Sequence, residues 1–386
     1  MRYSVLALVS LIAGCSGETS VSPPAPCKSN SDCTNRTEGP QCIVATGTCK
    51  PRGYPIGTHD GSPASVTLTL VYQAKLDDQP TGLAFNPDAP NELWLVNRAT
   101  DFATILYDPG LATTQSKRLH DPDALHFMHV PTGIAFGTKR YGMKGSWGTC
   151  GESDNPAGHH NSFMGPALFS ADLAIFAKPT ASGLGSHLDM LHDSPFCMGI
   201  AYEQDNIYWV FDGKHGSLAR YDFGEFHPPG GDDHSDGKIG QYVMGELARV
   251  PNIPSHLVFN PNDKMLYAAD SGHQRIVRLD TTSGTLGPLL PTKEPVVPRR
   301  MDNATLTVLV APGPLEAPSG IALNDGILYV TDNATSRITA FDLEGNLVRK
   351  LDTGLPAGSL AGLTFGADGK IYFVDMLASR VYRIDP

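Results

Sequence analysis

The sequence predicts an all-β fold, a six-bladed β-propeller preceded by a small N-terminal module rich in disulfides. Three observations predict it. Glycine (40 residues) and proline (31 residues) exceed their average combined usage of about 12%, and long helices tolerate such a composition poorly. One pattern of short strands recurs six times after Ser65. Four of the seven cysteines are clustered close to the N-terminus.

Residues 1–14 are predicted to be a lipoprotein signal peptide. Arg2 precedes a short apolar stretch, which is too short to span a bilayer as a helix. The stretch ends in Leu-Ile-Ala-Gly-Cys, which resembles a bacterial lipobox and predicts lipid attachment at Cys15. The alternative is an ordinary signal peptide followed by a chance cysteine. Residues 15–26 are a tether rich in Pro and Ser, so we expect a cell-envelope protein that contacts the membrane only through its lipid.

A Cys-rich mini-module is predicted over residues 27–50, followed by a linker over residues 51–64. Because the segment is polar and has little core, we expect two disulfides to stabilise it. The sequence leaves the pairing open among Cys27, Cys33, Cys42 and Cys49. A zinc site is the alternative, but the segment contains no histidine and a secretory route favours disulfides. The remaining cysteines, Cys150 and Cys197, are predicted to pair with each other.

Residues 65–386 contain six imperfect copies of one strand pattern. The first strand of each copy carries a small anchor residue, usually Gly, followed by alternating apolar residues. These first strands are Pro80–Phe85, Pro131–Phe136, Cys197–Tyr202, Pro254–Phe259, Pro318–Leu323 and Leu360–Phe365. Such a period of short strands is typical of a propeller. Gly suits the anchor position because the innermost strands of a propeller crowd around a central channel.

The second strand of most copies ends in Asp, and the third often begins with Arg. The terminal carboxylate is predicted to accept hydrogen bonds from turn amides. In three copies an Arg follows this Asp by five residues, which predicts ion pairs that brace the turn; they are Asp270–Arg275, Asp332–Arg337 and Asp375–Arg380. The second copy is interrupted by a predicted insertion from Thr138 to Phe163, before a strand over Ala167–Asp172.

The last copy ends after its third strand. Residues Val66–Tyr72 are therefore predicted to supply its outer strand, which would close the ring and cover an exposed sheet edge. Together the copies resemble the NHL-repeat family of six-bladed β-propellers, in a bacterial lipoprotein form with a short Cys-rich module. The resemblance implies the fold over the whole repeat region and says little about activity.

Two enzyme families are similar in fold to the NHL-like propeller. In peptidyl-α-hydroxyglycine α-amidating lyases, His residues beside the inner-strand Gly bind zinc in the channel. Those positions hold no His here; they are Thr81, Thr132, Met198, Ser255, Ser319 and Ala361. His256 replaces the anchor Gly itself, and one imidazole is too few ligands for zinc. The gluconolactonase family binds a calcium-type ion through channel oxygens, but here the strand-end Asp residues are better explained as turn caps.

The segment His227–Gly237 is an unusual insertion. It holds three carboxylates and an imidazole within five residues, which suggests a divalent cation bound by Asp232, Asp233, His234 and Asp236. Oxygen ligands alone would suit Ca²⁺, whereas His234 would favour Zn²⁺ or Mn²⁺. The alternative is an acidic surface loop without an ion.

One face of the propeller is predicted to carry a ligand, lined by the two insertions. The candidates for this face are His159, His160, Met198, His215 and His256. A second set of histidines could form a copper or zinc cluster or serve only as scattered hydrogen-bonding groups; it comprises His126, His129, His187, His192 and His215. Three tryptophans, Trp94, Trp147 and Trp209, are predicted to be core between blades.

The net charge is −11, and no stripe of Lys and Arg is present. We therefore do not expect nucleic acids or anionic membrane surfaces to be partners of this protein. The leading prediction is a binding or interaction scaffold for a protein, a peptide or a small molecule. The alternative is a metal-dependent lyase or hydrolase in the channel, and the convergence of three metal-ligating side chains at the channel mouth would favour it.

Overall fold

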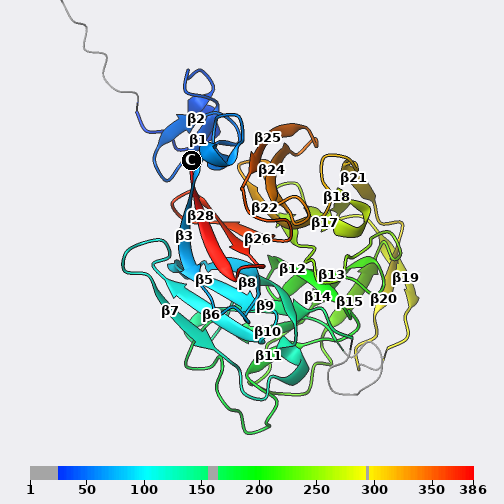
Figure 1. The fold of residues 1–386 in the computed structure, drawn as a ribbon. Helices are drawn as coiled ribbons and strands as arrows, with labels where there is room; N and C mark the ends of the chain where they lie inside the picture. Colours follow the sequence, from blue (N-terminus) through cyan, green and yellow to red (C-terminus); the bar gives the residue numbers. More distant parts are fainter. Residues whose placement is uncertain (1–24, 155–163, 293–294) are drawn as a thin grey trace, which may run out of the picture.

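The computed structural model describes residues 25–154, 164–292 and 295–386. The predicted lipidation residue Cys15 and the candidates His159 and His160 lie outside the described residues. Strands dominate the described chain (Figure 1), and its helices are single 3₁₀ turns: η1 (Asn30–Cys33), η2 (Tyr54–Ile56), η3 (Pro63–Ser65), η4 (Leu125–Met128) and η5 (Ser271–His273). Within this part of the chain, no helix has the length and apolar character needed to cross a membrane.

Six antiparallel sheets form the blades of a propeller, which confirms the predicted fold class. Blade 1 contains β4 (Pro80–Asn86), β5 (Ala89–Asn97), β6 (Phe102–Tyr107) and β7 (Gln115–Leu119). Blade 2 contains β8 (Pro131–Tyr141), β9 (Lys144–Gly151), β10 (Ala167–Ser170) and β11 (His187–Met190). Blade 3 contains β12 (Cys197–Gln204), β13 (Ile207–Asp212), β14 (Ser217–Asp222) and β15 (Lys238–Tyr242).

The second half of the ring has the same order of strands from the axis outward. Blade 4 contains β16 (Leu257–Asn260), β17 (Met265–Asp270), β18 (Arg275–Asp280) and β21 (Leu306–Val310). Blade 5 contains β22 (Pro318–Asn324), β23 (Ile327–Asp332), β24 (Arg337–Asp342) and β25 (Leu347–Asp352). Blade 6 contains β26 (Leu360–Phe365), β27 (Ile371–Asp375), β28 (Arg380–Asp385) and β3 (Thr67–Gln73). The six inner strands contact one another in a closed ring.

Blade 6 is closed by a strand from the other end of the propeller sequence, as predicted. Strand β3 pairs antiparallel with β28, with Tyr72 opposite Val381 and Leu68 opposite Ile384. Figure 1 shows these two strands side by side, blue against red. The Thr69 hydroxyl donates a hydrogen bond of 2.5 Å to Asp385. This pairing joins the two ends of the ring and removes an exposed strand edge.

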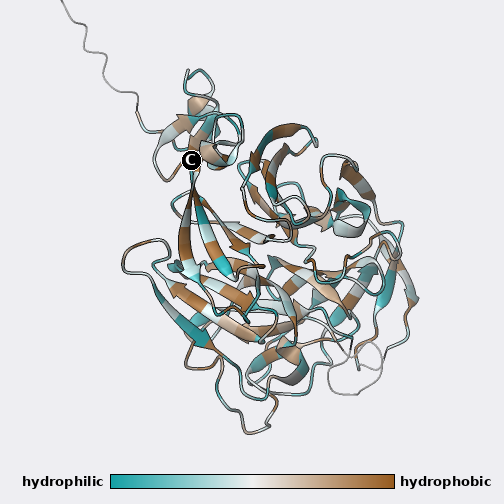
Figure 2. Ribbon diagram, viewed as in Figure 1, coloured by the Kyte–Doolittle hydropathy of each residue, from teal (hydrophilic) through white to brown (hydrophobic). Residues whose placement is uncertain are grey.

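The hydrophobic core lies between neighbouring blades, where alternate side chains of the strands meet. Hydrophobic residues concentrate in the strands (Figure 2). The indoles of Trp94, Trp147 and Trp209 are fully buried there, as predicted. Trp94 and Trp147 belong to one cluster between blades 1 and 2, and their ring centroids lie 5.7 Å apart. Each such cluster ties one blade to the next.

The carboxylates that end the second strands cap backbone amides, as predicted. Asp332 accepts hydrogen bonds from the amides of Glu316 (2.7 Å) and Ala317 (3.1 Å). The predicted Asp–Arg braces were correct only in blade 4, where Arg275 Nε donates to Asp270 Oδ2 at 2.8 Å.

The other two Arg side chains turn toward the outer strand of their own blade. Arg337 lies 3.7 Å from Asp352 of β25, and Arg380 donates to Gln73 of β3 at 2.7 Å. The five-residue spacing places each Arg opposite the Asp backbone but does not fix where its long side chain points.

The prediction of an insertion from Thr138 to Phe163 is wrong for its first half. Strand β8 continues to Tyr141, and β9 completes a hairpin through a turn at Gly142 (φ +76°). Strand β9 reads KGSWGTCG, so its small and polar residues hid the apolar pattern of the other second strands. Blade 3 also carries an unpredicted hairpin of β19 (Thr285–Leu289) and β20 (Arg299–Asp302), which extends the sheet beyond β15.

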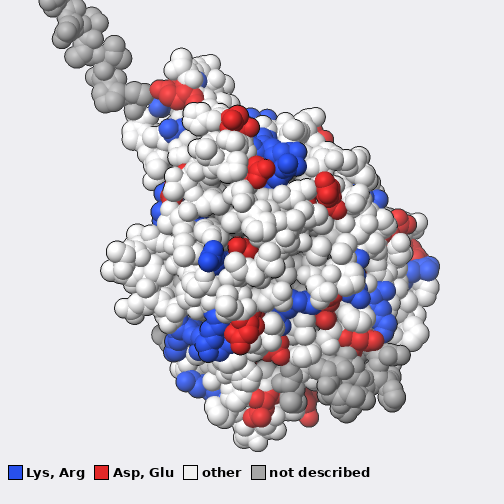
Figure 3. All heavy atoms as spheres, in the orientation of Figure 1, with Lys and Arg blue, Asp and Glu red and all other residues white. Residues whose placement is uncertain are grey.

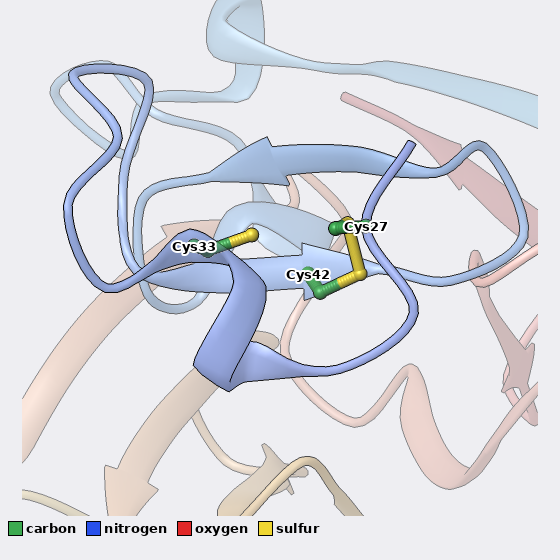
Figure 4. Close-up of side chains that lie close together, drawn as sticks. All are labelled: Cys27, Cys33 and Cys42. Carbon is green, nitrogen blue, oxygen red and sulfur yellow. A yellow bond between two sulfur atoms is a disulfide. The ribbon is translucent and has the colours of Figure 1, made fainter. Parts of the chain in front are cut away.

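The N-terminal module is a hairpin of β1 (Gln41–Ile43) and β2 (Thr48–Lys50) held by two disulfides. The structure chooses Cys27–Cys42 and Cys33–Cys49 among the three pairings. Figure 4 shows the bond between Cys27 and Cys42, with the Cys33 sulfur close by. The four buried cysteines form the core of the module.

The segment between the module and the propeller lies against blades 5 and 6. Ile56 is fully buried in the core between these blades, and the Gly61 carbonyl accepts a hydrogen bond from the Asp352 amide at 2.7 Å. The module therefore sits beside β3 and the C-terminus (Figure 1). A third disulfide, Cys150–Cys197, joins β9 of blade 2 to β12 of blade 3.

Candidate functional site

Five glycines and one histidine occupy the anchor positions of the six inner strands and form a ring around the channel. The glycines are Gly82, Gly133, Gly199, Gly320 and Gly362, and the sixth position is His256. A Cβ atom on Gly82 would lie 2.8 Å from the Gly133 Cα, and one on Gly320 would lie 2.9 Å from the Gly362 Cα. These separations are too short for a side chain, so the ring leaves room only for the single imidazole.

His256 reaches across this ring. Its Nε2 atom lies 2.8 Å from the carbonyl oxygen of Thr132 in blade 2 and donates a hydrogen bond to it. Its Cε1 atom faces Gly362 in blade 6, where an added Cβ would lie 2.9 Å away. Burial lowers the pKa of the imidazole, which favours its neutral form. The ring and its imidazole form the floor of a cavity.

A cavity of about 310 Å³ lies between this floor and the ends of the inner strands. All six blades line it, and we call it the funnel. Most of the side chains in its wall are apolar, although polar atoms contribute as much of its surface as apolar atoms do. The wall includes the aromatic residues Tyr202, Phe259 and Phe365 at the strand ends. Tyr202 is fixed by a hydrogen bond of 2.5 Å to the Thr138 hydroxyl. His256 is the one His, Asp, Glu or Cys among the described lining residues.

The opposite end of the channel is crossed by the side chains of Arg98, Glu152, Arg249 and Asn252, and we call it the charged mouth. Arg98 follows β5 of blade 1 and forms an ion pair of 2.8 Å with Glu152, which follows β9 of blade 2. Arg98 also donates to Asn252 at 2.8 Å, in the loop that leads into blade 4. Blades 1 and 4 face each other across a six-bladed ring, so this contact passes over the axis. Arg249 forms a second ion pair with Glu152.

The predicted ligand-face residues lie in different places. The prediction that Met198 lies on the ligand face is wrong. Its side chain is fully buried in the core between blades 3 and 4, because strand alternation turns it away from the channel that Gly199 lines. His215 lies in the turn between β13 and β14, at the same end of the propeller as the charged mouth, where Asp212 contacts its Nδ1 atom at 2.7 Å and raises the imidazole pKa. His256 faces the funnel.

The predicted cation loop is only partly drawn together. His234 Nδ1 lies 2.8 Å from Asp189 Oδ1 of β11, a residue that the sequence did not suggest. Asp236 Oδ1 lies 3.3 Å from His227 Nε2. Asp233 instead accepts hydrogen bonds from Ser235, and Asp232 is exposed. This group lies at the outer edge of the propeller, away from the channel.

Of the other histidines, His126, His187 and His192 lie near one another and near His234, whereas His129 and His215 lie elsewhere. His126 and His192 face each other at 2.9 Å between their Nε2 atoms. His129 contacts Asp101 at 3.0 Å, and His215 contacts Asp212. His187 lies between two carbonyl oxygens, those of Leu184 and Gly231. Burial, with a smaller contribution from His234, lowers the His187 pKa to about 4.

Sequence reasoning missed the charged mouth and Asp189. Arg98, Glu152 and Arg249 come from three loops with no shared motif, and only the closed ring brings them together. Asp189 lies in an outer strand that the repeat pattern did not define. The placement of Arg98 directly after the recognised second strand of the first copy was the available signal, because Glu152 follows a strand that the repeat pattern did not reveal.

Neither a protein-family model nor a curated protein sequence matches the chain. Several solved structures are similar in fold. An auxiliary nutrient binding protein from Bacteroides ovatus has a TM-score of 0.51 at 14% identity, over 83% of this chain and 76% of that chain. A luciferin-regenerating enzyme has a TM-score of 0.53 at 14% identity, over 83% of this chain and 95% of that chain.

A third neighbour is a nutrient binding protein of the same kind from Bacteroides thetaiotaomicron. Its TM-score is 0.52 at 12% identity, over 85% of this chain and 74% of that chain. The neighbours are six-bladed propeller proteins, and at these identities they support the fold alone. The chain is thus a six-bladed β-propeller with an apolar funnel at one end of its channel and a charged network at the other.

Proposed function

We propose that the chain is a cell-envelope binding protein of NHL-like type that holds an apolar group of a ligand in the funnel. The observation that carries this proposal is the shape of the channel. It is a cavity lined mainly by apolar side chains, open at an aromatic rim and closed at its floor by His256. Such concave apolar sites with one or two placed polar groups are typical of ligand binding.

The size of the funnel suggests the kind of ligand. Its volume of about 310 Å³ is at the lower end of the range of small-molecule pockets, about 300–1,000 Å³. It suits a small apolar molecule or one large side chain of a peptide. The neighbours described as nutrient binding proteins are consistent with a binding role for this fold.

A metal-dependent lyase or hydrolase in the channel receives no support from the residues that line it. The described lining offers a single imidazole, whereas a catalytic zinc site has three protein ligands.

Attachment to the envelope is part of the proposal. It rests on the apolar stretch of residues 1–14 and on Cys15, followed by the Pro- and Ser-rich tether. The acidic net charge of −11 favours solubility of the propeller at the end of such a tether. On the face shown in Figure 3, acidic and basic residues are interspersed on a largely neutral surface.

The proposal is tested by titrating the purified full-length protein with the apolar fluorophore Nile red. Ala322 lies on the funnel wall, and Ala322→Trp would fill the cavity. We expect saturable binding to the unaltered protein and at least about tenfold weaker binding to the variant. Leu76→Ser removes an exposed apolar side chain elsewhere and is the control, with unchanged affinity. Absence of saturable binding, or equal binding by both variants, would refute the proposal.

A further inference from the structure

We propose that Asp189, His227, His234 and Asp236 bind one Zn²⁺ ion where the outer edges of blades 2 and 3 meet. Asp189 lies in β11, the outermost strand of blade 2. The other three residues lie in the loop between β14 and β15 of blade 3. This site is remote from the funnel, so the inference does not depend on the proposed binding function.

Main-chain hydrogen bonds attach the loop to β11. The His227 amide donates to the Leu188 carbonyl at 3.0 Å, and the Gly230 amide donates to the His187 carbonyl at 2.8 Å. These bonds fix the start of the loop along the edge of blade 2. The His227 side chain is thereby held beside Asp189, with the imidazole only 20% exposed.

Asp189, His227 and His234 already lie close to the spacing that zinc requires, whereas Asp236 lies beside His227 and would move closer to the other two on binding the ion. Ligand atoms 2.0–2.2 Å from a tetrahedral ion lie about 3.4 Å from one another. Here His227 Nε2 lies 3.7 Å from Asp189 Oδ2 and 3.3 Å from Asp236 Oδ1. One ligand atom each from Asp189, His227 and His234 lies within 4.8 Å of the other two.

A second observation points to a cation. Asp189 Oδ2 is buried and has no hydrogen-bond donor among the described residues, and the Asp189 side chain is only 1% exposed. Its other oxygen accepts from His234, whose side chain is 6% exposed. A buried carboxylate oxygen without a partner is costly. A divalent ion between Asp189 and His227 would satisfy it, and two carboxylates would balance the charge of the ion.

The ligand chemistry selects the metal. Two imidazoles and two carboxylates suit Zn²⁺, whereas Ca²⁺ takes six to eight oxygen ligands. His187 is not a ligand, because both of its ring nitrogens face carbonyl oxygens. Asp189 and His227 thus take the place of Asp232 and Asp233 among the ligands predicted from the sequence. The bound ion would fasten the loop to the neighbouring blade.

The test uses the full-length protein after treatment with a chelator. Zn²⁺ is added in competition with a chromophoric zinc indicator, and Co²⁺ is added separately as a spectroscopic probe. We expect one equivalent of bound metal, with the visible absorption bands of tetrahedral Co²⁺. His227→Gln, at a partly exposed position that tolerates the change, should weaken zinc binding at least about tenfold. Asp189→Asn should do the same.

Two matched controls keep the inference falsifiable. Asp233→Asn alters a carboxylate of the same loop, and His215→Gln alters an imidazole in the turn between β13 and β14; neither should change zinc affinity. The inference is overturned if the protein binds no stoichiometric zinc, or if His227→Gln binds it as tightly as the unaltered protein. Nile red binding is measured in the same samples, so failure of the metal site and failure of the funnel are distinguished.

Discussion

His256 shows how one residue can set the character of a propeller channel. Five of the six anchor positions are glycines in contact around the axis, and the sixth carries the imidazole that reaches the Thr132 carbonyl. The sequence indicated the special position of His256 because it interrupts a Gly pattern. It did not show that the side chain would cross the channel, since that depends on the diameter of the closed ring.

The glycine ring leads to a prediction about stability. In Gly82→Ala, the new methyl group would lie 2.8 Å from the Gly133 backbone of the next blade, which cannot move without its sheet. We expect a loss of about 1–3 kcal/mol in the free energy of unfolding, measured by urea denaturation. Leu111→Ala, at an exposed position, should change it by less than about 0.5 kcal/mol. Equal effects would contradict the crowded ring.

Asp121 leads to a prediction about pH. Its carboxylate is fully buried and accepts two hydrogen bonds from Ser186, and burial raises its pKa from 3.8 to about 6. A raised pKa in the folded state means that Asp121 favours folding below pH 4 and that this contribution is lost as the pH rises through 6.

The variant Asp121→Asn keeps an acceptor for Ser186 and carries no charge at any pH. It should be more stable than the unaltered protein at pH 8, by about 2 kcal/mol, and the advantage should vanish at pH 4. Thermal or urea unfolding at the two pH values measures the difference. An advantage of the same size at both pH values would show that the charge of Asp121 is not the cause.

Among the strands and their connections, the closure of blade 6 was predicted correctly, whereas two features of blade 2 were missed. The pairing of β3 with β28 is present in the structure. It could be predicted because the last copy lacked a fourth strand and an unassigned strand preceded the first copy. The hairpin of blade 2 was missed because the small residues of β9 do not show the aliphatic pattern of the other second strands. Asp189 was missed as a candidate ligand of the loop for a related reason, since it lies in an outer strand without a motif.

The disulfide between blades 2 and 3 can be tested separately from those of the module. Cys150→Ser should expose one free thiol, that of Cys197, after denaturation, and should destabilise the propeller by about 2–5 kcal/mol. Cys27→Ser also frees one thiol, but its bond lies in the N-terminal module, so unfolding of the propeller should change little. Thiol titration and urea denaturation give both values. Finding no new thiol in Cys150→Ser would refute the bond.

At the scale of the whole molecule, the repeat pattern predicted the number of blades, their order and the closure of the ring. It predicted the position of the channel but not its chemistry. The apolar rim at Phe259 and Phe365 and the charged mouth at Glu152 both depend on residues from several blades meeting around one axis. Such meetings are long-range consequences of closure and leave no local motif.

The position of the molecule in the cell leads to a further prediction. In a bacterial host that processes lipoproteins, Cys15→Ala should release the protein from the membrane fraction, because a lipid is the only anchor that we predict. Cell fractionation followed by immunoblotting measures the distribution, with Cys27→Ser as the control that stays with the membrane. Retention of Cys15→Ala would count against lipidation.

The central claim is that the ligand enters at the apolar funnel and not at the charged mouth. It is tested most directly by placing the same bulky residue at each end of the channel. Nile red affinity is measured for Ala322→Trp in the funnel and for Lys214→Trp at the other end of the channel. Lys214 contacts Asp154 there and follows Gly213, which lies beside Arg249 of the charged mouth. The account predicts at least about tenfold weaker binding for Ala322→Trp alone. Weaker binding for Lys214→Trp alone, or the same affinity in both variants, would contradict it.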